Sequence, residues 1–183
     1  MEHPCAILRS ENQSILSILE VLEEICFLLR ADQEILQMDL VSIADFLSRY
    51  AEDFHNGKEN QLLYPAMEAD GLFLNNPEAQ VLSKEHDTGK AFINEVNKIT
   101  AGGAFDKEEF IQHAESYIDH MRQHIQAEET IVLPLAEKKL SATELSRLQK
   151  AFDAWEKSEA GTETEHDFQR LINYFRLKFL HNL

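Results

Sequence analysis

The sequence predicts an all-α protein: an up-down four-helix bundle followed by a helical C-terminal extension. Along most of the 183 residues, apolar side chains recur three and four positions apart, which is the spacing of one helix face. The chain has only 6 Gly and 4 Pro, which leaves few places for turns and favours long helices. No β-type alternation competes with this interpretation.

The first two helices are expected at about 6–29 and 39–69. Ile15, Leu19 and Leu22 belong to the apolar face of the first helix, and residues 31–33 loosen its end. An Asp-Gly pair at 70–71 is expected to stop the second helix, because Gly is a strong helix terminator.

The third and fourth helices begin at recognisable start signals. The Asn-Pro-Glu segment 76–78 predicts a capping Asn with Pro at the first helical position, opening a helix that ends near residue 100. Residues 106–109 resemble a capping box and open the fourth helix. Pro134 is expected to bend or end that helix, because Pro removes a backbone hydrogen bond and clashes with the preceding turn.

Two more capping boxes, at 141–144 and 162–165, predict a short fifth helix and a sixth. We therefore expect a bundle over 1–140 and a helical extension over 141–183. The extension should cover the bundle or form a homodimer contact. Its apolar face is formed by Phe152, Trp155, Phe168, Leu171, Phe175 and Phe179.

Composition excludes several classes of partner. A formal net charge of -16 disfavours nucleic acid, since little is available to neutralise phosphates, and it also disfavours anionic membrane surfaces. Cys5 and Cys26 are isolated and suit a reducing cytosol, with Cys26 expected in the core. No stretch reaches transmembrane length and the acidic N-terminus is no signal peptide, so we expect a soluble cytoplasmic protein.

One pattern occurs twice. His55 and Glu59 form a His-x-x-x-Glu motif, as do His124 and Glu128, and each motif has a Pro ten residues after its His. Either pair alone could be an ordinary solvated contact, but at a usage of about 5% a prescribed Pro in both copies has a chance of roughly one in four hundred. Residues i and i+4 share a helix face, so each motif can present an imidazole and a carboxylate to one metal. These donors suit an oxophilic transition metal such as iron.

The chain also resembles a known family, the hemerythrin-like (HHE cation-binding) proteins. The matching segments are 54–65, 85–90 and 122–134, and the tail at 161–166 is similar as well. The resemblance implies a non-haem di-iron centre inside a four-helix bundle, with two Glu bridging the metals and His completing the coordination. By position, the implied ligands are His55, Glu59, His86, His124 and Glu128. A single His such as His86 is otherwise more often a satisfied polar residue.

The family's first-helix His falls on Asn12, which leaves the second iron short of one nitrogen. Asn12 could ligate through its amide oxygen or line the site, and Glu11 could turn in from one position away. His120, one turn before His124, could supply an imidazole, or it could lie beside the site or at the bundle end. Tyr64 and Tyr117 could hydrogen-bond the carboxylates or be core aromatics, and His3, His113, His166 and His181 are expected at the surface.

The resemblance implies an iron protein that binds or senses dioxygen or nitric oxide, handles iron, or repairs damaged iron centres. We expect a small diatomic ligand as partner, and binding rather than enzymatic turnover. Two alternatives stay open: a metal-free bundle that serves as an interaction module, and a mononuclear zinc or iron site.

Overall fold

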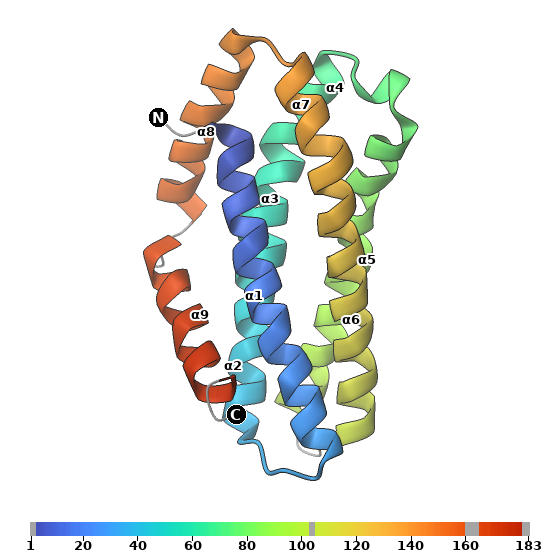
Figure 1. Ribbon diagram of the computed structural model, residues 1–183, viewed down its shortest axis with the longest axis vertical. Coiled ribbons are helices and arrows are strands. Elements are labelled where there is room, and N and C mark those ends of the chain that lie inside the picture. The colour runs from blue at the N-terminus through green and yellow to red at the C-terminus, as the bar shows by residue number, and fades with distance from the viewer. Residues whose placement is uncertain (1–2, 103–104, 160–164, 181–183) are drawn as a thin grey trace.

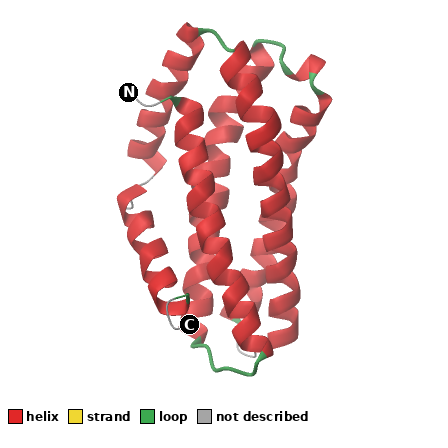
Figure 2. Ribbon diagram, viewed as in Figure 1, coloured by secondary structure: helices red, strands yellow, loops and turns green. Residues whose placement is uncertain are grey.

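The computed structural model describes residues 3–102, 105–159 and 165–180, and all of its regular elements are helical (Figure 2). Four antiparallel arms form the bundle, and two further helices lie along one side of it beside the first arm (Figure 1). The arms are α1 (Pro4–Arg30), a second arm over 37–69, α5 (Pro77–Ala101), and a fourth arm over 107–139. The all-α bundle predicted from the sequence is confirmed.

The second and fourth arms each combine several helical segments. The second arm consists of α2 (Gln37–Leu47), η1 (Ser48–His55), α3 (Asn56–Lys58), η2 (Glu59–Leu63) and α4 (Tyr64–Ala69). A short 3₁₀ turn, η3 (Phe73–Asn75), leads into α5. The fourth arm consists of α6 (Lys107–Ala127), η4 (Glu128–Val132) and α7 (Leu133–Lys139). The C-terminal extension consists of α8 (Ala142–Glu159) and α9 (Glu165–Phe179).

Wide π-helical turns explain how the arms continue past their prolines. The turns η2 and η4 each end two residues before a proline, Pro65 or Pro134, and contain the residue four positions before it. Proline clashes with the carbonyl of that residue in a regular α-helix, and a wider turn relieves the clash. Of the two outcomes expected at Pro134, a bend or an end, the end does not occur, because the arm continues as α7 to Lys139.

Most of the expected helix ends agree with the structure. The Asp106 side chain accepts from the Glu109 amide at 3.0 Å, and the Ser141 hydroxyl caps the Glu144 amide at 3.1 Å. Gly71 adopts the left-handed φ of 68° that a helix stop favours. Asn76 does not cap α5 with its side chain: its amide instead donates to the Leu72 carbonyl at 2.7 Å.

The extension packs against the bundle. The Phe168 ring lies 4.8 Å from that of Tyr50 and 5.6 Å from that of Phe54, and Cys26 is buried in the same core as predicted. At 18 residues α8 is longer than the short helix expected. The predicted capping box at 162–165 lies largely outside the described residues. No helix among the described residues is long and apolar enough to span a membrane.

A close contact joins α8 to the second arm. A Cβ added at Gly57 would lie 2.9 Å from the Trp155 ring, and the Trp155 indole donates to the Phe54 carbonyl at 3.2 Å. Gly57 therefore allows the indole to approach the helix backbone.

Gly57→Ala should destabilise the protein, although Ala is normally better in a helix by about 1 kcal/mol. The new methyl group must displace the indole, which we expect to cost roughly 1–3 kcal/mol net. Thermal unfolding measures the loss, and fluorescence of the single Trp reports the displaced ring. In a Trp155→Phe background, where the indole is absent, the same Gly57→Ala change should cost less stability than it does in the parent. A single variant more stable than the parent would contradict the contact.

Candidate metal centre

The five residues predicted to bind metal lie together in the bundle interior. They form two overlapping groups. Within each group, one potential ligand atom from every residue lies within 4.8 Å of the others. One group consists of His55, Glu59 and Glu128, and the other of Glu59, His86 and His124. All five are buried, and Glu59, at 0% exposure, belongs to both groups. Three separate arms therefore converge on one carboxylate.

The π-helical turns coincide with these ligands. His55 ends η1, Glu59 begins η2 and Glu128 begins η4. A π turn rotates the side chains that follow it relative to an α-helix, and such turns are frequent at functional sites. The repeated Pro of the two motifs therefore marks a backbone feature that both arms use where a ligand is presented.

The donor set fits a cation. Among the described residues, few buried side-chain polar atoms lack a hydrogen-bond partner, and most of these atoms surround this centre. They include His55 Nε2, Glu59 Oε1, Glu128 Oε1 and Asn12 Oδ1. A buried polar atom without a partner is costly, whereas a cation held by His55, Glu59 and Glu128 would give each of these three residues a partner.

Each of the three histidines has its Nδ1 beside an oxygen acceptor. His55 Nδ1 lies 2.9 Å from Glu11 Oε2, His86 Nδ1 lies 3.0 Å from Asn60 Oδ1, and His124 Nδ1 lies 3.3 Å from Glu85 Oε2. An Nδ1–H that donates to such an acceptor leaves the Nε2 lone pair of His86 and His124 for a metal, and the acceptor also fixes the ring orientation. Burial opposes protonation of His55, but neighbouring carboxylates, Glu11 first, raise its pKa well above the ordinary value, so a cation would displace a proton from this ring. The partner residues Asn60 and Glu85 were not predicted from the sequence.

The second group brings two imidazoles together in a T-shaped contact, with ring centroids 4.7 Å apart and an interplanar angle of 65°. His86 Nε2 lies 3.0 Å from His124 Nε2 and 3.2 Å from Glu59 Oε2. Burial lowers the pKa of His86 to about 3, helped by the neighbouring His124, and burial likewise lowers the pKa of His124. Both rings are thus neutral at pH 7, which is the protonation state a metal ligand requires.

The first group combines two carboxylates with one imidazole. Burial, and then the charge of Glu128, raise the pKa of Glu59 well above its ordinary value. Burial opposes ionisation of Glu128 as well, but the His55 imidazole, whose Nε2 lies 3.9 Å from Glu128 Oε2, helps to leave the Glu128 pKa lowered. Without a cation, the pair therefore holds one carboxyl group neutral and one ionised. A cation bound between them would let both ionise.

Asn12 faces this group, as its place in the first helix predicted. It is fully buried, and its amide donates to Glu128 Oε2 at 3.1 Å and to Glu129 Oε1 at 3.2 Å. Glu11 does not belong to either ligand group and instead contacts His55 Nδ1. His120 Nε2 donates to the Glu85 backbone carbonyl at 3.1 Å, so this nitrogen is turned to α5 rather than to the centre.

A buried lysine, Lys58, lies behind His55. Its side chain is 0% exposed, its Nζ contacts Glu11 Oε1, and Glu156 of α8 lies 3.5 Å away. The ammonium also stands over the Phe54 ring at 4.4 Å. Sequence reasoning missed Lys58, because a Lys inside a helical motif is ordinarily solvated. Its charge balances Glu11, which in turn holds His55.

The two tyrosines have different partners. Tyr64 donates to the ligand carboxylate Glu59 at 3.3 Å, whereas Tyr117 donates to Glu52 at 2.9 Å. Glu52 also accepts from Asn56 at 3.0 Å and lies one helical turn before His55. Of the remaining histidines, His3 and His166 are exposed and His181 lies outside the described residues. His113 is half-buried rather than at the surface as expected.

A helical bundle in which buried His and Glu side chains from three arms form two potential ligand groups is the arrangement expected of a carboxylate-histidine metal-binding protein. The chain belongs to the hemerythrin HHE cation binding domain family, whose model matches residues 3–136. The match ends before the extension, so the tail similarity noted in the sequence lies outside it.

Three curated relatives of the chain carry no named function. Uncharacterized proteins of Mycobacterium bovis and of two Mycobacterium tuberculosis strains are 28% identical over 149 residues. The alignment covers 79% of this chain and 56% of each relative, so the chain spans little more than half their length. No solved structure matches the chain.

Glu52→Gln should flatten the pH dependence of stability. Burial raises the pKa of Glu52 to about 7 from 4.5, although Tyr117 and Asn56 act against the increase. Above pH 4.5 the unfolded chain releases a proton that folded Glu52 keeps, so the free energy of unfolding falls as pH rises from about 4.5 to about 7. The loss is at most roughly 3 kcal/mol.

Denaturant unfolding of parent and variant between pH 4 and 8 measures this difference. Tyr117→Phe is the companion variant: it removes a hydrogen bond to the ionised form, so the loss should move to higher pH. If the free energy of unfolding changed with pH equally in the parent and in Glu52→Gln, Glu52 would be ionised in the folded protein.

Proposed function

We propose that the chain is a non-haem iron protein that binds or senses dioxygen or nitric oxide, or handles iron, at the central His/Glu site. The observation that carries this proposal is Glu59, a buried carboxylate common to two ligand groups that have imidazole nitrogens facing inward. Such a carboxylate is suited to bridging two metals in a bundle. Carboxylate and imidazole donors without sulfur favour iron over thiophilic metals.

The choice of a small ligand is supported by incomplete coordination. The group with Glu128 has only one imidazole, because Asn12 stands where a second would be expected. Bound iron would supply an open coordination position and redox chemistry. The surrounding chain excludes bulk water through burial, and it holds the ligand rings through Glu11, Asn60 and Glu85.

A groove of about 570 Å³ between α5 and the fourth arm supports access from solvent. Its lining includes Glu85 and His120, and Glu85 also contacts the ligand His124. A diatomic molecule approaching along this groove would therefore come within one side chain of the centre. The free Cys5 and Cys26 support a reducing compartment such as the cytosol.

Iron content tests the proposal. Protein purified from its native host should hold about two iron per chain, and chelation should lower the melting temperature, because a metal bound only by the folded state stabilises it. About one iron supports the mononuclear alternative, and none supports the metal-free interaction module. An unchanged melting temperature after verified metal loss would contradict a buried site.

Glu59→Gln should lower the iron content of both ligand groups, because this carboxylate belongs to both of them. His55→Ala and His124→Ala should each lower mainly one position. Glu52→Gln is the matched control: it is a buried carboxyl on the same arm but outside both groups, and it should retain the parent's iron. Iron loss in the control equal to that in Glu59→Gln would mean that any buried change disrupts binding.

Asn12→His should raise iron occupancy where the parent holds less than two per chain. The new imidazole would replace an amide that already contacts Glu128, and it would supply the nitrogen that this group lacks. Iron analysis with absorption spectroscopy measures the gain. Asn12→Ala is the control, since it removes the amide without adding a donor. A gain in both variants would show that removing the amide, not adding an imidazole, is responsible.

A further inference from the structure

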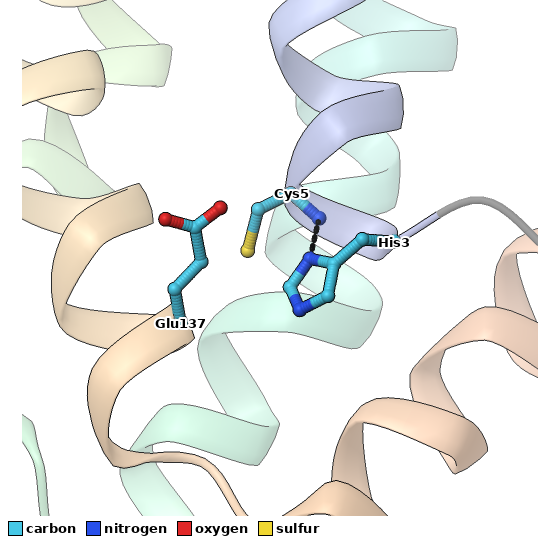
Figure 3. Close-up of side chains that lie close together, drawn as sticks. All are labelled: His3, Cys5 and Glu137. Atoms are coloured by element: carbon cyan, nitrogen blue, oxygen red, sulfur yellow. Dashed lines mark hydrogen bonds between the residues drawn. The ribbon is translucent and has the colours of Figure 1, made fainter.

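A second set of metal-binding side chains lies at the end of the bundle where α1 begins. His3 and Cys5 approach Glu137 of α7, and one ligand atom from each lies within 4.8 Å of the others. Figure 3 shows the Cys5 Sγ between the Glu137 carboxylate and the His3 ring. This cluster contains sulfur, which distinguishes it from the central site.

We propose that His3, Cys5 and Glu137 form a second metal site that takes a divalent cation of the zinc class. Thiolate, imidazole and carboxylate are all established zinc donors, and three protein ligands leave a fourth position for water. Sulfur shifts the preference of the site toward zinc and away from the harder cations.

Cys5 is the ligand that sets the character of the site. It is 0% exposed, and burial together with the charge of Glu137 raises the pKa of its thiol to about 12. The free thiol is therefore protonated and unreactive at neutral pH. Binding of a divalent cation replaces that proton, which passes to solvent, so affinity should rise with pH.

The other two ligands have partners that a cation would replace, and both oxygens of Glu137 contact the Arg9 guanidinium. His3 is exposed, and its Nδ1 accepts only one long hydrogen bond, from the Cys5 amide at 3.3 Å, so its ring can turn toward the thiol. Glu137 pairs with Arg9, whose Nη2 lies 3.0 Å from Oε2. Arg9 also contacts Glu129 at 3.2 Å and so keeps an acidic partner if Glu137 turns to a cation.

A cation here would connect the two ends of the family domain. Cys5 and Glu137 lie 132 positions apart in the sequence. Cys5 stands at the start of the first arm and Glu137 near the end of the fourth. A metal that closes so long a loop constrains the unfolded chain more than a local contact would. The site would thus stabilise the bundle as a structural cross-link.

Cobalt(II) is the probe for this site, because cobalt bound to thiolate gives an intense near-ultraviolet charge-transfer band that nitrogen and oxygen ligands do not give. Titration of the full reduced chain should develop this band to about one thiolate-bound cobalt per chain, and zinc should abolish it. The central site contains no Cys, so metal bound there does not contribute. The outcome is thus separable from that of the central iron site.

Cys5→Ser should abolish the band. Cys26→Ser is the matched control, because Cys26 is also buried in α1 but lies outside the cluster, and the band should persist. His3→Ala changes an exposed residue, so the fold is retained, and we expect cobalt affinity to fall by about tenfold or more. No band in the parent, a band that survives Cys5→Ser, or unchanged affinity in His3→Ala would overturn the proposal.

Discussion

Two carboxylates in the dry interior of a helical bundle are the constraint on which the rest of this structure depends. Glu59 and Glu128 are 0% exposed, and removing such groups from water costs several kcal/mol each unless they are paired, protonated or coordinated. The chain offsets this cost with His55 and with hydrogen bonds from Tyr64 and Asn12. The orphaned oxygens that remain are those a cation would satisfy.

The burial of these charges also connects the C-terminal extension to the metal centre. Glu11 holds His55, and a buried Glu11 needs a countercharge, which Lys58 supplies. Lys58 in turn is covered by α8, which places the Phe152 ring 5.3 Å and Glu156 3.5 Å from its ammonium. The chain of contacts thus runs from a ligand imidazole through two buried charges to a helix beyond the matched family domain. Removing α8 would expose Lys58 to water and change the field at His55 without touching a ligand.

The sequence predicted which His and Glu residues come together better than it predicted the side chains that support them, for a physical reason. A ligand motif repeats, and the i, i+4 spacing of His55 and Glu59 survives small changes of helical geometry. Lys58 lies between those two residues, and its burial depends on α8, which sequence spacing cannot place. The π turns were also missed, because the apolar pattern follows a 3.6-residue period and does not reveal an i to i+5 turn. Glu11 was considered as a ligand, whereas only the structure shows it turned to His55 Nδ1.

Asn12 makes the two halves of the centre chemically unequal. The half with His86 and His124 has two neutral imidazoles and lies beside the solvent groove through Glu85. The other half has one imidazole and two carboxylates, and the Asn12 amide donates to one of those carboxylates instead of offering a second nitrogen. Both halves present three donors, but this half has one imidazole fewer, and the hydrogen bond from Asn12 withdraws charge from its second carboxylate, Glu128. A metal would therefore be expected to bind first and leave last in the imidazole-rich half, which is also the half beside the groove.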